Sequence, residues 1–146
     1  MKLLLTSAGL TNSSIGNALK ELVSKNPSDS LVAYVPTASN AEPGNKDWVI
    51  KDFINLYRFG FNNIDIVDPT AAGIDWKKRM EPADIIYLSG GNTFHLLDQF
   101  RKTGLDKWLN EKLADKVYVG VSASTIIAGP TIEELVFRRE MIIFLT

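Results

Sequence analysis

The chain has 146 residues, of which 45% are hydrophobic and 23% charged, and its formal net charge is −1. This balance is typical of a globular domain and excludes intrinsic disorder and fibrous repeats. The basic residues form no continuous stripe, so we expect no nucleic-acid partner. The absence of cysteine excludes disulfides, thiolate metal sites and a thiol nucleophile.

Short apolar runs alternate with longer amphipathic segments, which is typical of strands and helices that alternate around a mostly parallel sheet. In chain order, the sequence predicts a strand over 2–7, a helix over 13–24, a strand over 31–36, a helix over 46–59, a strand over 63–67, a short helix over 74–80, a strand over 84–88, helices over 93–101 and 105–113, and a strand over 117–121. In the helix over 46–59 we expect the apolar face to consist of Val49, Ile50, Phe53, Ile54 and Tyr57, with Gly60 at the C-terminal end.

No segment predicts export or membrane insertion. The N-terminal apolar run has only three leucines, against the roughly 7 to 15 apolar residues of a signal peptide and the ~20 of a membrane span. We therefore expect a cytoplasmic protein without a membrane partner. The sequence has neither an internal repeat nor a linker, which predicts one α/β domain over residues 1–146.

Residues 133–146 end on an apolar run with no helix after it. A terminal edge strand is one interpretation. Because an exposed apolar edge promotes association, a homodimer interface through this segment is another, and an unnatural end of the chain is a third.

A pair of glycines follows the strand predicted over 84–88. Gly90 and Gly91 allow a tight turn and a close approach of the backbone to a ligand. Asn92 or Thr93 can cap the next helix, whose N-terminus favours developing negative charge. The segment therefore predicts either an oxyanion pocket or only a glycine turn with a helix cap.

The strand over 117–121 runs into Ser122 in a pattern close to the nucleophile elbow G-x-S-x-G, in which a sharp turn exposes a serine hydroxyl above the sheet. Gly120 fits the pattern, whereas Ser124 stands where glycine is expected, which predicts looser packing. Ser122 is therefore interpreted either as a nucleophile or as a helix cap.

Taken together, segments 90–94, 120–123 and 128–132 resemble the peptidase E (aspartyl dipeptidase) family, which also includes cyanophycinase-like enzymes. The similarity extends from about residue 1 to residue 133. It implies a three-layer α/β sandwich with a mostly parallel, flavodoxin-like sheet, related to class I glutamine amidotransferases with serine in place of their cysteine. It also implies a serine peptidase that needs no cofactor and cleaves small acidic peptides, namely dipeptides with an N-terminal aspartate.

The resemblance also implies roles for individual residues. Ser122 matches the nucleophile, and the backbone N–H groups of Gly91 and Ala123 match the oxyanion donors. Asn92 and Thr93 are the implied substrate-binding residues.

The other members of the catalytic triad are harder to place. The family's catalytic histidine lies well downstream of the serine, whereas none of the 24 residues after Ser122 is a histidine. We therefore expect an incomplete triad in a chain that lacks the C-terminal part of the family domain. His95, the only histidine, is interpreted either as a substitute base or as a partly exposed residue on a helix face.

The acidic residues give no clear partner for the serine. Glu133 and Glu134 lie nearest to the position of the family's acidic residue. Asp47, Asp52 and Asp68 are spaced like surface or turn charges, and no pairing of histidine with carboxylates predicts a metal site.

Three hypotheses for function follow. The first is a serine hydrolase of the peptidase E type, and the second is a non-catalytic, dimeric remnant with the same fold. The third, a flavodoxin-like nucleotide binder, is disfavoured because Ser7, Ala8 and Gly9 after the first strand do not form the G-x-G-x-x-G fingerprint.

Overall fold

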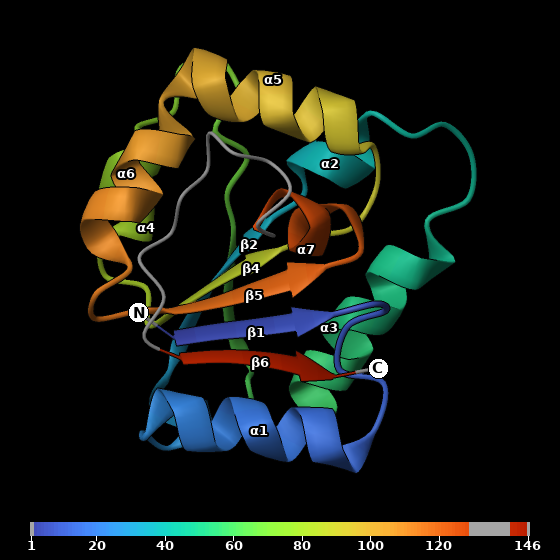
Figure 1. Cartoon of the computed structure of the whole chain (residues 1–146), viewed down its shortest axis with the longest axis vertical. Coiled ribbons are helices and arrows are strands. Elements are labelled where there is room, and N and C mark those ends of the chain that lie inside the picture. Colours follow the sequence, from blue (N-terminus) through green and yellow to red (C-terminus); the bar gives the residue numbers. More distant parts are fainter. Residues whose placement is uncertain (1, 129–140, 146) are drawn as a thin grey trace.

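The computed structural model describes residues 2–128 and the backbone of 141–145. The strands of this part of the chain are β1 (Lys2–Thr6), β2 (Leu31–Val35), β3 (Asn63–Ile66), β4 (Ile85–Leu88), β5 (Val117–Val121) and β6 (Met141–Leu145). They form one six-stranded sheet in the order β3-β2-β4-β5-β1-β6, and every neighbouring pair is parallel (Figure 1). All the carboxyl ends therefore lie at the same edge of the sheet.

Helices connect the strands in the described part of the chain. They are α1 (Ser13–Val23), the 3-10 turn η1 (Pro27–Asp29), α2 (Thr37–Asn40), α3 (Asp47–Arg58), α4 (Trp76–Met80), α5 (Thr93–Thr103), α6 (Leu105–Lys112) and α7 (Ala123–Ile127). The five strands and five helices predicted over residues 2–121 are all present, with small differences at their ends. The sequence did not predict η1 or α2.

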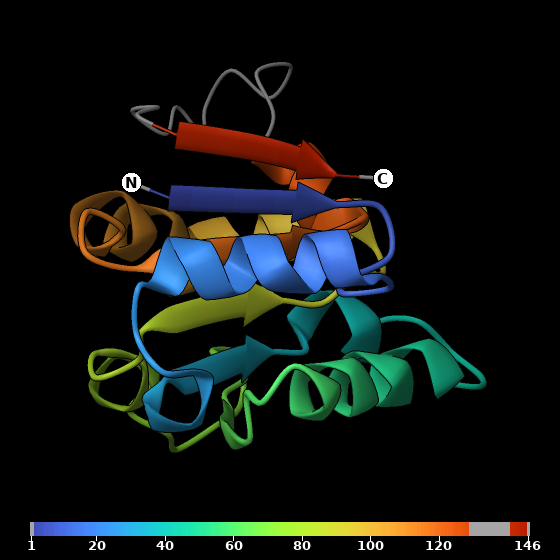
Figure 2. The ribbon, with the colours of Figure 1, turned by 90° about the horizontal axis from the view of Figure 1, so that it is seen from below.

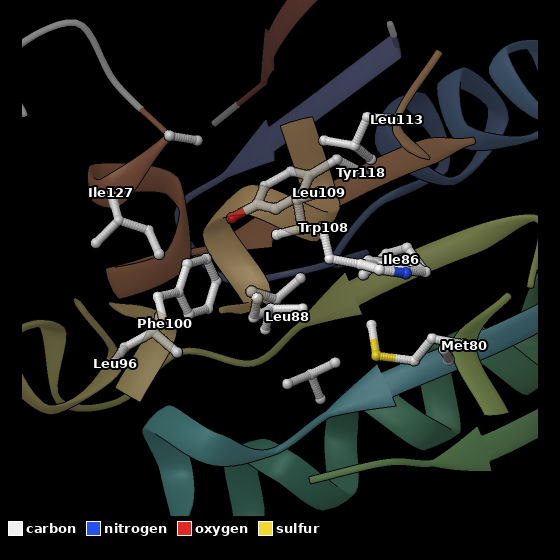
Figure 3. Close-up of a cluster of buried hydrophobic side chains, with 14 of the residues drawn as sticks. Met80, Ile86, Leu88, Leu96, Phe100, Trp108, Leu109, Leu113, Tyr118 and Ile127 are labelled. Atoms are coloured by element: carbon white, nitrogen blue, oxygen red, sulfur yellow. The ribbon is translucent and has the colours of Figure 1, made fainter. Parts of the chain in front are cut away.

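The sheet is covered on both faces, because successive side chains of a strand point to opposite sides. Leu4 of β1 packs in a cluster with residues of α1 and α3, whereas Leu3 and Leu5 pack in a second cluster with residues of α4 to α7. Figure 2 shows α1 and α3 against the sheet, and Figure 3 shows the second cluster. The predicted three-layer α/β sandwich is confirmed.

The apolar face predicted for α3 was partly wrong. Ile50, Ile54 and Tyr57 are 56%, 59% and 61% exposed, while Asp52 and Leu56 are buried. Val49 and Phe53 pack partly buried against the core, as predicted, and Asp52 and Leu56 lie on the same inward face.

The final described strand, β6, pairs in parallel with β1 from Lys2 to Thr6. The interpretation of the terminal segment as an edge strand is thus confirmed for Met141–Leu145, while residues 133–140 lie outside the described residues. A homodimer through this edge stays a prediction, which sedimentation velocity over a range of concentrations would test. No helix in the described part of the chain is long and apolar enough to cross a membrane.

Candidate active site

The loops that follow β4, β5 and β1 meet at the carboxyl edge of the sheet. These strands are neighbours, and their last residues are in register, since Thr6 pairs with Val121 and Leu88 with Gly120. A cavity of about 290 Å³ opens at this point. Its lining comes from all three loops and from α3: Ser7, Ala8, Trp48, Asp52, Gly90, Gly91, Val121 and Ser122. Such an edge is where parallel α/β sheets usually bind ligands, and the volume is close to the lower end for small-molecule sites.

Ser122 lies between β5 and α7 in a sparsely populated backbone conformation, with φ 50° and ψ −105°. Its N–H donates to the Thr6 carbonyl at 3.0 Å, and its carbonyl accepts from Thr125 and Ile126. The side chain is exposed and makes no capping hydrogen bond. Ser122 is therefore the N-cap residue of α7 by position, but its hydroxyl does not cap the helix. Strain of this kind costs ~1–3 kcal/mol and is concentrated at functional sites.

Ser124 holds this turn in place. Its side chain is completely buried, and its Oγ accepts from the Val121 N–H at 2.6 Å and donates to the Leu88 carbonyl at 2.7 Å. A Cβ added to Gly120 would lie only 3.1 Å from the Ser124 backbone. The looser packing predicted for serine at this position is not observed, because the hydroxyl links β4 to β5 within a tight turn.

The loop that contains Gly90 and Gly91 packs closely against α2. Gly91 has φ 134°, and a Cβ there would lie 2.3 Å from the Ala38 carbonyl oxygen, which no side chain can tolerate. The next N–H, that of Asn92, donates to the same carbonyl at 3.1 Å. A Cβ on Gly90 would lie 3.4 Å from the Ser122 Cβ, so the loop passes directly beside the serine.

Gly91 and Ala123, the predicted oxyanion donors, lie near Ser122: Gly91 lines the same cavity, and Ala123 follows the serine in the chain. Ala123 is the first residue of α7, where an N–H has no partner within the helix. Neither this N–H nor that of Gly91 donates to another residue of the described chain. Unpaired N–H groups beside a hydroxyl can bind an oxygen on which negative charge develops.

The polar residues after the glycine pair serve the helix. Asn92 Oδ1 accepts from the His95 N–H at 2.8 Å, so Asn92 is the N-cap of α5, as one interpretation predicted. Asn92, Thr93 and His95 are partly buried, and none of them is among the residues that line the cavity. Their roles in substrate binding and as a base stay predictions.

Asp52 is the cavity residue that sequence reasoning missed. It is 3% exposed, and it accepts hydrogen bonds from the Tyr34 and Tyr87 hydroxyls, each at 2.9 Å. Burial raises the pKa of its carboxyl to about 6, although both tyrosines lower it. The prediction of a surface or turn charge was wrong for this residue. Its spacing from Val49 and Leu56, three and four residues away on α3, was the available signal, since it places a carboxylate on the helix's inward stripe.

The remaining acidic candidates do not contribute to the described site. Glu133 and Glu134 lie outside the described residues. Asp68 binds Thr37, Asn40 and Thr70. Over the described residues, no group of three or more histidine, aspartate or glutamate side chains is placed to hold a metal ion.

Comparisons with known proteins agree with this geometry. The profile of peptidase family S51 matches residues 3–143. The chain belongs to peptidase family S51. An uncharacterised peptidase of Listeria monocytogenes is 36% identical over 104 residues, which cover 69% of this chain and 49% of that protein. Peptidase E of Escherichia coli is 40% identical over 68 residues, which cover 46% of this chain and 27% of that enzyme.

Two solved structures share the fold. A crystal structure whose name assigns a Listeria monocytogenes EGD-e protein to peptidase E superposes with a TM-score of 0.76 at 31% identity. The superposition covers 89% of this chain and 63% of that one. A peptidase from an acI-B1 Actinobacterium, at 20% identity and a TM-score of 0.67, supports the fold alone. The predicted resemblance to the peptidase E family and its flavodoxin-like sheet is confirmed. The chain spans about half the length of the Listeria peptidases it matches.

Proposed function

We propose that this S51 chain carries the nucleophile and oxyanion half of a serine-type hydrolase that cleaves small acidic peptides, in particular dipeptides with an N-terminal aspartate. One observation carries the proposal. The exposed Ser122 hydroxyl lies at a strained strand-to-helix turn and shares its cavity with the glycine loop. The name of the Escherichia coli relative, peptidase E, supports the substrate class.

The chemistry is acyl transfer. Ser122 Oγ attacks the scissile carbonyl, and the N–H groups of Gly91 and Ala123 stabilise the negative charge that develops on its oxygen. The peptide C–N bond then breaks, the amine leaves with a proton, and water hydrolyses the ester on Ser122. A serine hydroxyl needs a base to accept its proton, and His95 does not line the cavity. The proposal therefore assigns the base to no residue in the described part of the chain.

The second candidate is a non-catalytic binding protein with the same fold. The observation that favours it is that His95 is not among the residues that line the cavity with Ser122. This candidate retains the cavity but predicts no turnover.

Hydrolysis of an aspartyl dipeptide or a chromogenic aspartyl amide distinguishes the two. The hydrolase proposal predicts measurable turnover by the native chain, with a base that the described residues do not supply, and its fall to background in Ser122→Ala. Ser14→Ala is the matched control, because Ser14 is an exposed serine on α1, and it should retain native activity. Equal, background-level turnover by the native chain and Ser122→Ala would contradict the hydrolase and favour the binding protein.

A further inference from the structure

Asp52 is a buried carboxylate in the wall of the cavity that Ser122 lines. Its hydrogen-bond partners in the described structure are two neutral phenols, Tyr34 from β2 and Tyr87 from β4. Buried carboxylates are normally paired with a cation, because desolvation of an unpaired charge is costly. An ionised carboxylate accepts about four hydrogen bonds, so two phenols leave part of this capacity unused.

The loop after β1 packs closely against this carboxylate. A Cβ on Gly9, in the loop after β1, would lie 2.6 Å from Asp52 Oδ1 and 2.7 Å from the Tyr87 hydroxyl. Any side chain at this position would displace the Asp52–Tyr87 pair. Glycine therefore lets the loop pass close to the carboxylate without contacting it through a side chain.

Trp48 supplies an aromatic surface beside the same space. It precedes Asp52 by one turn of α3, so the two side chains project in a similar direction, and both line the cavity. A Cβ on Gly90 would lie 3.7 Å from the Trp48 ring and 3.4 Å from the Ser122 Cβ. Gly90 therefore lies between the indole and the serine and is close to both.

A carboxylate and an indole together match the chemistry of a primary ammonium group. The ammonium has three N–H donors and a positive charge, which a carboxylate accepts and an indole face attracts within about 6 Å. An anionic group would be repelled from the same position. The acidic side chain of the proposed substrate would therefore point away from Asp52.

We propose that Asp52 and Trp48 form a subsite for a primary ammonium group in the cavity that holds Ser122. This inference rests on the proposed function, since it defines how one end of a peptide is held beside the nucleophile. In a peptide the group is either the N-terminal α-ammonium or the ε-ammonium of a lysine. Asp52 is a binding residue in this account, and it takes no part in the bond-breaking steps.

Isothermal titration calorimetry on Ser122→Ala measures this subsite without turnover. The probes are L-alanyl-L-alanine, with an α-ammonium, Nα-acetyl-L-lysine, with an ε-ammonium, and N-acetyl-L-alanyl-L-alanine, with neither. At pH 7.5 at least one ammonium probe should bind, and Asp52→Asn should weaken it by about tenfold or more. The probe that loses affinity identifies the source of the ammonium. Asp47→Asn, an exposed aspartate on the same helix, is the matched control and should change nothing.

A titration of the Asp52 carboxyl carbon by NMR in Ser122→Ala provides a second readout that needs no Asp52 variant. A bound ammonium favours the ionised carboxylate, so the preferred probe should lower the Asp52 pKa from about 6, and N-acetyl-L-alanyl-L-alanine, which has no ammonium, should not. A purely structural Tyr–Asp–Tyr cluster would leave the pKa unchanged with every probe.

Three results would overturn the subsite: no binding of either ammonium probe, binding of the probe without an ammonium as tight as that of the preferred ammonium probe, or an Asp52 pKa that no probe moves. Because these measurements use a variant without the nucleophile, they do not depend on catalysis. Failed hydrolysis with intact ammonium binding would refute only the proposed function. Retained hydrolysis with failed binding would refute only the subsite.

Discussion

Replacing Asp52 with asparagine should change how the stability of the fold depends on pH. Burial raises the pKa of Asp52 in the folded chain to about 6, from an ordinary value of 3.8. Between these values the folded state holds more protons than the unfolded state, so the free energy of unfolding falls as the pH rises. For a pKa of about 6, the contribution lost between pH 5 and pH 8 is ~1.4 kcal/mol. Asparagine cannot ionise and removes this contribution.

Urea denaturation at pH 5 and pH 8, followed by tryptophan fluorescence, measures the effect. The free energy of unfolding of Asp52→Asn minus that of the native chain should be about 1.4 kcal/mol more positive at pH 8 than at pH 5. Asp47→Asn serves as the exposed control and should show no such change. Asp68 does not interfere: burial raises its pKa, but hydrogen bonds lower it to a net value below normal, so its contribution is lost only at more acidic pH. A difference that is the same at both pH values, or larger at pH 5, would refute the reasoning.

Three further substitutions test the parts that hold the site, each by urea denaturation, with the exposed Ser14→Ala expected within ~0.5 kcal/mol of native. Gly91→Ala should cost roughly 2–4 kcal/mol, because its Cβ would meet the Ala38 carbonyl at 2.3 Å; native stability would contradict the close approach. Ser124→Ala should cost about 1–3 kcal/mol, since it removes the buried hydroxyl that bonds the Val121 N–H and the Leu88 carbonyl, and a neutral effect would argue against its bridging role. Phe100→Ala should cost about 3–5 kcal/mol, because Phe100 is 1% exposed in the cluster of Figure 3; a loss below ~1 kcal/mol would show that the cluster repacks.

The sequence predicted the sheet well because its strands are covered on both faces. Every residue of β4 and β5 is buried, and such strands appear as short continuous apolar runs that differ clearly from helices. The orientation of α3 was not predictable in the same way. Helical spacing places Asp52 on the inward side, but a carboxylate is accommodated there only because Tyr34 and Tyr87, 18 and 35 residues away along the chain, donate hydrogen bonds to it.

The site was predictable only where its signals are local in the sequence. The glycine pair and the Ser122 turn are local patterns, and the structure brings them together in one cavity. The role of Ser124 depends on the Leu88 carbonyl, 36 residues away. Comparison with the local elbow pattern therefore showed only that Ser124 replaces the expected glycine. Asn92 was open to two interpretations because a helix cap and a ligand-binding amide have the same local sequence pattern; the structure supports the cap.

The central claim is that Ser122 is a nucleophile beside backbone oxyanion donors. Treatment with a fluorophosphonate, followed by intact-mass and peptide mass spectrometry, tests it most directly, because the reagent forms a stable bond to an activated serine. The account predicts a single adduct on Ser122 that is absent from Ser122→Ala and retained in Ser14→Ala. No adduct on the native chain, or an adduct on a different residue, would contradict it.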